Sequence, residues 1–419
     1  MKYVINTNVA SPHTVPLALA LAGILGDANV AYAYYRQPSD PIRSKDEYEK
    51  VSRIAIDARN DVNLARDASL ASDVLIENVR DFDVMDKRAE LRKPTFYVSE
   101  RWFRPFRFEL PFRVLYAPGK ELLFSGFLKM AFPFAIKRAI KICKLLTDRG
   151  NNFMYLPIGV YAARDMARLC GLMNGDYRCL FRSPEIEFEG TPGGRIWLKG
   201  LSPGEDGNRR YCLDKMRMWG YFVQRSDALG DRVTCPTETA LHHVRVLWVG
   251  RMLNLKRVDD VIRAVGELAE TKPQDAAWDD ISLDVYGDGP DRARLARIAC
   301  RYKTSVALHP YLPYKEVRKV MRNHDVYVLS SNAVEGWGAV VNEALEEGMI
   351  VIGTHEAGSC ATILPKANLY AAGDWRGLAD VLHGPIAKTS IGKWTPYDAA
   401  LAITTLVEEM IKRNHNADE

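Results

Sequence analysis

The second half of the chain alternates short apolar runs with amphipathic helical patterns, and this rhythm restricts the possible folds more than any other feature of the sequence. The run VLWVG at 246–250 predicts a buried strand, and residues 257–270 after it predict a helix. The apolar positions of that helix fall on one face: Val258, Ile262, Val265 and Leu268. The exchange of strand and helix continues to the run IVIGT at 350–354. Such alternation builds a parallel, doubly wound sheet with helices on both faces.

The first half of the chain shows a less regular version of the same rhythm. Its apolar runs predict strands at 2–7, 72–79, 94–100 and 152–160. At 419 residues the chain is too long for one ordinary hydrophobic core. We therefore predict two Rossmann-like α/β domains, at 1–225 and 240–390, and a C-terminal helix within 391–419. Thr395 is the expected N-cap of this helix, with Pro396 as its first residue.

Residues 183–210 interrupt the first domain with a stretch rich in Gly and Pro. The segments EIEFE and RIWLK flank the tetrapeptide TPGG, and this arrangement predicts a β-hairpin. We interpret the whole stretch as an insertion or a mobile loop.

Cysteine usage and hydropathy indicate the compartment. The seven cysteines are scattered without a C-x-x-C pair or a metal-ligand spacing, which is typical of reduced thiols in a cytosolic protein. The longest apolar run, residues 15–26, is shorter than the roughly 20 residues that a membrane span requires. The polar stretch NTNVASPH does not fit a signal peptide. We therefore expect a cytoplasmic protein.

Two carboxylates flank a glycine-rich turn where a predicted strand gives way to a helix. Glu335 precedes Gly336 and Gly338, and Glu343 lies at the start of the helical run. A helix N-terminus with nearby glycines suits a pyrophosphate, because its N–H groups are unpaired and its backbone can approach closely. An ionised Glu only accepts hydrogen bonds, so each carboxylate should face hydroxyl groups, which a nucleotide diphosphate sugar offers on its sugar and its ribose. The alternative is that both acids simply complement the helix dipole.

Other strand-end loops of the second domain carry cations and glycines. Arg251 and Lys256 follow its first strand, Gly287 and Gly289 follow the second, and the loop at 353–359 follows a later one. Ligands of parallel sheets lie beyond the carboxyl ends of the strands, so we expect these loops to converge on one site. Two cations at such a site can neutralise a diphosphate leaving group. For Arg251 and Lys256 alone, a solvated loop is the alternative.

This set of motifs resembles glycosyltransferase family 4, whose members are retaining enzymes of the GT-B fold. The motifs GR(x)4K, GDGP(x)R(x)2L, DVYVLSS, EGWGAVVNEAL and GT(x)3G occur in the order and spacing of that family. The resemblance covers about 245–385, and the pair Glu335 and Glu343 is its most specific mark. The stretches YVSERWFR and KMRMWGYF resemble its bacterial polysaccharide-assembly branch. The sequence departs from the family at Arg257, where a glycine is common.

The resemblance implies an architecture and roles for single residues. It implies two domains that face each other across a cleft, with the last helix returning to the N-terminal domain. In the family the first Glu contacts the donor sugar, the second contacts the ribose hydroxyls, and the Arg and Lys hold the diphosphate; these roles fall on Glu335, Glu343, Arg251 and Lys256. The remaining donor-side candidates lie in the same motifs: Gly287, Gly289, Gly336, Trp337, Gly338 and Ala339. The family uses no essential metal, so we expect no cofactor beyond the donor substrate.

The candidates in the first domain also follow predicted strands. His13 lies between the first strand and the first helix, where many GT-B enzymes carry a functional His or Gly. We expect it to orient the acceptor hydroxyl or the donor, and the alternative is a cap-like hydrogen bond at the helix start. Glu100 and Arg101 follow one later strand, and Tyr161 and Asp165 follow another. These four residues are acceptor-side candidates.

Residues 101–144 concentrate positive charge. Ten Lys or Arg residues oppose two Glu residues there, so the segment carries +8 while the remainder of the chain carries −4. Aromatic residues interleave with the basic ones, and the run FAIKRAIKICKLL predicts a basic amphipathic helix. This pattern suits an anionic membrane surface, whereas the alternative is a solvated basic face of a helix that packs on its own sheet. Nucleic acid is not an expected partner, because the remainder of the chain is acidic on balance.

Together these features predict a retaining, hexosyl-type glycosyltransferase. We expect it to use a UDP sugar, or next a GDP sugar, and to act on a glycan or lipid-linked acceptor, on the inner face of the membrane. Three alternatives stay open: a catalytically silent partner subunit, a sugar epimerase of the GT-B fold and a nicotinamide-dependent oxidoreductase. The last would require a G-x-G-x-x-G motif, and none follows KYVINT or VLWVG.

Overall fold

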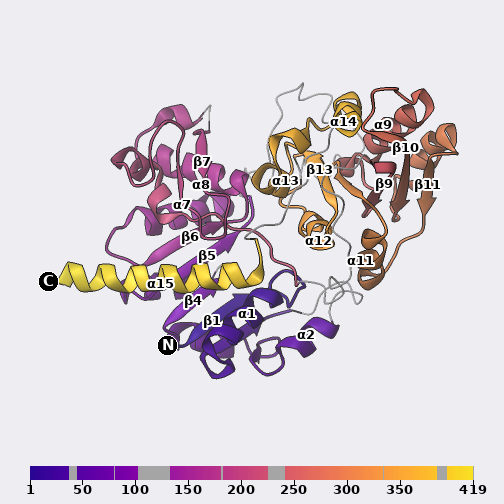
Figure 1. Ribbon diagram of the computed structural model, residues 1–419. Helices are drawn as coiled ribbons and strands as arrows, with labels where there is room; N and C mark the ends of the chain where they lie inside the picture. The colour runs from indigo at the N-terminus through magenta and orange to yellow at the C-terminus, as the bar shows by residue number, and fades with distance from the viewer. Residues whose placement is uncertain are drawn as a thin grey trace. The chain divides into compact units, whose positions relative to one another are not determined.

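A computed structural model describes residues 1–36, 45–79, 81–101, 133–180, 183–224, 241–333, 335–384 and 394–418 (Figure 1). These residues form two compact units. Unit 1 holds the described residues up to Gln224 together with 394–418, and unit 2 holds the described residues from Leu241 to Gly384. Each unit is built on a six-stranded sheet whose pairings are all parallel, which confirms the predicted pair of α/β domains.

The sheet of unit 1 has the strand order β3-β2-β1-β4-β5-β6. Its strands are β1 (Tyr3–Thr7), β2 (Val30–Tyr34), β3 (Ala55–Asp57), β4 (Val74–Glu77), β5 (Thr95–Ser99) and β6 (Phe153–Pro157). Its helices include α1 (Val15–Leu25), α2 (Lys45–Val51), α3 (Val62–Ala71), α4 (Phe82–Glu90), α7 (Pro133–Thr147) and α8 (Val160–Met173). Four strands, β1, β4, β5 and β6, are buried along their whole length, as expected of parallel strands covered on both faces. The strand order reverses at β1, because Tyr3 pairs with both Val30 and Val74.

The C-terminal helix α15 (Pro396–Asp418) packs against α1 within unit 1 (Figure 1). Thr395 caps it as predicted, because its hydroxyl oxygen accepts a hydrogen bond from the Asp398 N–H at 3.1 Å. The buried face of this helix supplies Ala399, Ile403 and Val407 to the core. The end of the chain is thereby part of the same unit as its beginning.

The predicted hairpin is present as the antiparallel pair β7 (Ile186–Phe188) and β8 (Ile196–Leu198). Its turn reaches α15 at Gly193, which has a φ of +74°. A Cβ at Gly193 would lie 2.8 Å from the Cβ of Ala402. The Gly193 N–H also donates to the main-chain oxygen of Met218 at 2.9 Å. Residues 183–210 therefore contain the predicted hairpin, and its turn packs against the C-terminal helix.

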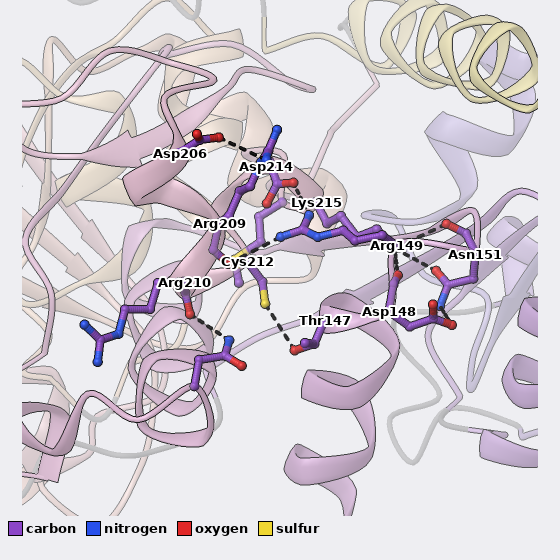
Figure 2. A network of polar contacts seen from close by, with 12 residues as sticks. Thr147, Asp148, Arg149, Asn151, Asp206, Arg209, Arg210, Cys212, Asp214 and Lys215 are labelled. Atoms are coloured by element: carbon purple, nitrogen blue, oxygen red, sulfur yellow. Dashed lines mark hydrogen bonds and ion pairs between the residues drawn. The ribbon is translucent and has the colours of Figure 1, made fainter. Parts of the chain in front are cut away.

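A polar network joins the segment after this hairpin to the end of α7 (Figure 2). Lys215 is 7% exposed and donates to the side-chain and main-chain oxygens of Asn151 at 2.8 and 3.2 Å. Burial lowers the pKa of Lys215 to about 8. An ion pair between Arg149 and Asp214 belongs to the same network. These contacts fix the start of the segment 216–224, which continues along β6.

The sheet of unit 2 has the strand order β11-β10-β9-β12-β13-β14. Its strands are β9 (Leu241–Val249), β10 (Trp278–Tyr286), β11 (Val306–His309), β12 (Val326–Leu329), β13 (Ile350–Thr354) and β14 (Leu369–Tyr370). Its helices are α9 (Val258–Thr271), α10 (Arg292–Ala299), α11 (Tyr314–Arg322), α12 (Val340–Glu346), α13 (Gly358–Ile363) and α14 (Trp375–His383). Successive residues of β9 enter opposite core clusters, Leu247 in one and Trp248 in the other. No helix among the described residues is long and apolar enough to cross a membrane.

Candidate functional site

The donor-side candidates follow the carboxyl ends of the strands of unit 2. The loop after β9 carries Arg251 and leads into a short 3-10 helix, Asn254–Lys256. The loop after β10 carries Gly287 and Gly289, and the loop after β12 carries Glu335. β9 pairs with both β10 and β12 in parallel, so these loops leave the same edge of the sheet.

Lys256 and Glu335 form an ion pair in which the ammonium of Lys256 donates to Oε2 of Glu335. The two side chains are 23% and 18% exposed, so the pair is partly buried. Two hydrogen bonds to main-chain oxygens hold their loops together. Asn332 N–H donates to the main-chain oxygen of Leu255 at 2.9 Å, and the Ser330 hydroxyl donates to that of Lys256 at 2.6 Å. The structure thus brings together a cation and an acid that lie far apart in the sequence.

Glu343 lies in the first turn of α12 and is 7% exposed. The charges of Glu343 and Glu335 both influence the ionisation of Tyr327. This residue of β12 is fully buried, and its hydroxyl donates to the main-chain oxygen of Val249 at 3.3 Å. Burial, and then the charges of Glu343 and Glu335, raise the pKa of Tyr327 well above its usual range. The charges of both acids of the predicted pair thus affect the same buried phenol.

The turn between these acids depends on Gly338. Its φ of +87° favours glycine, and an added Cβ would lie 2.7 Å from Cδ2 of Leu329. The Trp337 side chain is 1% exposed, and its Nε1 donates to Oδ1 of Asn342 at 2.8 Å. The indole of Trp337 is thus a core group that supports the turn. Ala339 is the N-cap residue of α12, and its main-chain oxygen accepts from Glu343 N–H at 3.3 Å.

Gly287 and Gly289 allow two strand-end loops to interlock. A Cβ at Gly287 would lie 1.9 Å from the Gly250 oxygen, and one at Gly289 would lie 2.5 Å from the Met252 oxygen. Met252 N–H also donates to the Asp288 oxygen at 2.8 Å. Arg251 lies between these main-chain contacts, and its side chain is exposed. The glycines therefore fix the backbone that presents Arg251.

The departure at Arg257 has a structural reason. Arg257 has a φ of +47°, in the left-handed region where glycine is favoured. Its guanidinium forms two hydrogen bonds with Asp260, at 2.6 and 2.9 Å, and the same carboxylate accepts from Gly373 N–H at 3.0 Å. The hydrogen bonds to Asp260 raise the pKa of Arg257. Asp260, which the sequence analysis did not single out, thus anchors the residue that follows Lys256.

The acceptor-side candidates meet at the carboxyl edge of the unit 1 sheet. Arg101 Nε lies 3.8 Å from Oδ2 of Asp165, and the Arg101 guanidinium lies 4.6 Å from the ring centroid of Tyr161. Burial lowers the pKa of Arg101. The structure thus groups these three predicted residues, from the end of β5 and from α8, into one cluster.

His13 and Glu100 are linked through a residue that the sequence analysis missed. The Tyr221 hydroxyl donates to Oε1 of Glu100 at 2.6 Å, and the Tyr221 ring lies 5.4 Å from the His13 ring. Thr14, and not His13, takes the N-cap position of α1. The only sequence signal for Tyr221 was its place in the stretch KMRMWGYF. Among the described residues, no three His, Cys, Asp or Glu side chains gather in a group that could hold a metal ion.

Part of the chain matches a known protein family in sequence. Residues 241–383, which is nearly all of unit 2, match the family described as Glycosyl transferases group 1. No curated protein matches the chain in sequence.

Solved structures match over almost the whole chain. The apo form of the lipopolysaccharide outer core galactosyltransferase WaaB has a TM-score of 0.54 and 13% identity, covering 98% of this chain and 99% of its own. HepE from Anabaena, in complex with UDP, has a TM-score of 0.54 and 12% identity, covering 99% of this chain and all of its own, 100%. The protein therefore has the predicted GT-B fold, and its second unit matches the group 1 glycosyl transferases.

Proposed function

We propose that the protein is a retaining glycosyltransferase that moves a hexose from a nucleotide diphosphate sugar to a glycan or lipid-linked acceptor, without a resident metal or cofactor. The observation that carries this proposal is the Lys256–Glu335 ion pair, followed by Glu343 in the first turn of α12, in the unit that matches group 1 glycosyl transferases. The UDP bound to HepE, which shares the fold, favours UDP over GDP as the donor nucleotide. Assignment to family 4 and to its polysaccharide-assembly branch belongs to the same proposal.

The proposed mechanism begins with an exchange of partners at Lys256. The donor diphosphate takes the ammonium of Lys256 and the exposed guanidinium of Arg251, which neutralise its charge. Glu335, released from Lys256, accepts hydrogen bonds from hydroxyls of the donor sugar, and Glu343 accepts them from the ribose.

As the bond from the anomeric carbon to the diphosphate breaks, its electron pair leaves with the phosphate oxygen, and an oxocarbenium-like state forms. The acceptor hydroxyl then bonds to the anomeric carbon on the face that the diphosphate leaves, so the configuration is retained. Its proton passes to the departing diphosphate. His13 orients the acceptor hydroxyl.

A thermal-shift panel of UDP, GDP, ADP, dTDP and NAD(H) tests the proposal on wild type and on Glu343→Ala. A ligand at about 100 times its dissociation constant stabilises the protein by about 2.7 kcal/mol. We expect UDP to stabilise wild type, and Glu343→Ala to lose most of that shift because the ribose loses its acceptor. The exposed Glu316→Ala serves as the control and should keep the full shift.

A response to NAD(H) alone, or to no diphosphate, would contradict the proposed donor site. Binding of UDP without turnover of any UDP sugar would instead favour the catalytically silent subunit. Conversion of a UDP sugar into its isomer, with no acceptor present, would favour the epimerase.

The second part of the proposal concerns binding at the inner face of a membrane. Of residues 101–144, the structure describes Arg101 and α7, and the rest of the segment lies outside the described residues. The apolar face of α7 is buried: Ala139, Ile142, Cys143 and Leu146. This burial leaves the apolar face of α7 unavailable for insertion and leaves its outer face basic, with Lys137, Arg138 and Lys144 exposed. We therefore propose a peripheral contact through charge alone.

Replacing Lys137, Arg138 and Lys144 together by Gln is expected to weaken binding to vesicles with an anionic lipid about 100-fold. Each surface cation contributes about 1 kcal/mol at an anionic membrane, so three contribute about 3 kcal/mol. Cosedimentation with phosphatidylglycerol vesicles measures the change, and neutral phosphatidylcholine vesicles should bind neither protein. A charge-matched triple variant in unit 2, Arg301, Lys303 and Lys319 to Gln, is the control. Equal loss in both triple variants would rule out a specific role for α7.

A further inference from the structure

The segment 216–224 extends the sheet of unit 1 beyond β6. Isolated parallel bridges join Met216 to Tyr155 and Trp219 to Ile158. Trp219 N–H donates to the Pro157 oxygen at 3.1 Å, so the segment reaches the carboxyl end of β6. The chain then carries Tyr221 to the loops that follow β1 and β5. Tyr221 therefore meets residues from two distant parts of the sequence.

Tyr221 makes a different kind of contact with each of these loops. Its ring and the imidazole of His13 have centroids 5.4 Å apart and planes at 33°, within the range of attractive ring contacts. Its hydroxyl donates to Glu100 at 2.6 Å, the short distance expected of a bond to a carboxylate. Burial, and then the charge of Glu100, raise the pKa of Tyr221 well above its usual range. The phenol therefore stays protonated at neutral pH and can donate its hydrogen bond to Glu100.

Both rings border a narrow cavity of about 30 Å³. Much of its lining is aliphatic and comes from the strands and the loop after β6: Ile5, Ile76, Val98 and Ile158. Polar side chains from the same strands and loops complete the lining, among them Asn6, Thr14 and Asn78. Within this cavity the Tyr221 ring contacts the imidazole of His13 and so restricts how that ring can turn.

We infer that Tyr221 is a positioning residue of the acceptor side, which holds the His13 ring through its own ring and the Glu100 carboxylate through its hydroxyl. This inference rests on the proposed function, in which His13 and Glu100 lie on the acceptor side. One tyrosine then couples the loop after β1 to the loop after β5. The hydroxyl contact can be removed alone, because Tyr221→Phe keeps the ring, whereas Tyr221→Leu removes both contacts.

The first measurement follows the His13 ring itself and needs no activity. Protein labelled with 15N at histidine gives ring signals, and the His13 signal is the one that disappears in His13→Gln. We expect Tyr221→Leu to shift this signal and Tyr221→Phe to leave it within the linewidth. Tyr177→Leu, at a tyrosine that is 71% exposed, is the matched control and should also leave it unchanged. An unmoved His13 signal in a folded Tyr221→Leu protein would overturn the inference.

The second measurement follows hydrolysis of the UDP sugar that wild type turns over fastest among UDP-glucose, UDP-galactose and UDP-N-acetylglucosamine. Loss of one positioning contact is expected to lower kcat about tenfold and to leave KM for the donor unchanged, since unit 2 binds the donor. Tyr221→Phe and Glu100→Ala remove the same hydrogen bond, so the double variant should lose no more than either single variant. Independent, multiplying losses would overturn the link through Glu100. If wild type hydrolyses none of the three sugars, the proposed function is what fails, and the His13 signal still decides the role of Tyr221.

Discussion

Glu335→Gln is expected to lower turnover about 100-fold or more, which corresponds to about 2.7 kcal/mol of lost transition-state stabilisation. Gln has the shape of Glu but no charge, so it can neither pair with Lys256 nor stabilise positive charge on the donor sugar. The steady-state rate of UDP-sugar hydrolysis or transfer measures the effect. Near-normal turnover would contradict the role of Glu335 in the proposed mechanism.

A matched variant separates this effect from a general loss of charge. Glu316 on α11 also forms an ion pair with a lysine, Lys319, and Glu316→Gln should keep normal turnover. UDP itself offers a further contrast, because it carries no donor sugar. We expect Glu335→Gln to keep the stabilisation by UDP that Glu343→Ala loses. A Glu335→Gln protein that no longer responds to UDP would show that Glu335 supports the nucleotide and not the sugar.

The two sheets were predictable because parallel strands that are buried on both faces consist of nearly continuous apolar runs. VLWVG and IVIGT became β9 and β13, and both are covered on two faces, so almost every residue in them is apolar. The segment 216–224 was not predicted as a strand. It pairs with β6 only through isolated bridges, and its polar start is fixed by the network around Lys215. The sequence therefore predicted the central sheet better than its edge.

The site was predictable where its residues share a short motif. The spacing of Glu335 and Glu343 follows from one turn and one helix, so the pair could be recognised along the chain. Tyr221 could not be recognised in this way, because its contact with His13 depends on how loops from distant segments meet. The left-handed backbone of Arg257 was hidden for another reason, since an Arg gives no signal of a positive φ.

Arg88 is a buried cation whose partners are all neutral. It lies on α4, is fully buried and donates a hydrogen bond from Nε to Thr95 Oγ1 at 2.9 Å. Its other donors bind the Ser72 hydroxyl and four main-chain oxygens, those of Ser69, Ser72, Asp73 and Pro94. Burial lowers the pKa of Arg88 to about 10, so the guanidinium stays charged at neutral pH. One side chain thus satisfies acceptors at the end of α3 and at the starts of β4 and β5.

Replacing Arg88 by Met is therefore expected to destabilise the protein by about 4 kcal/mol, because several buried oxygens lose their only charged donor. For a unit of this size such a loss corresponds to a fall in Tm of about 10 °C. Calorimetry measures the change, and Arg88→Lys should recover roughly half of it, since a lysine keeps the charge but offers only three N–H donors. Arg66, whose side chain is 36% exposed and forms ion pairs at 4.0 and 3.5 Å with Asp81 and Asp83, provides the control, and Arg66→Met should change stability by less than about 0.5 kcal/mol. A Tm for Arg88→Met as high as that of Arg66→Met would mean that the main-chain oxygens around Arg88 find other donors, and that this guanidinium does not hold α3, β4 and β5 together.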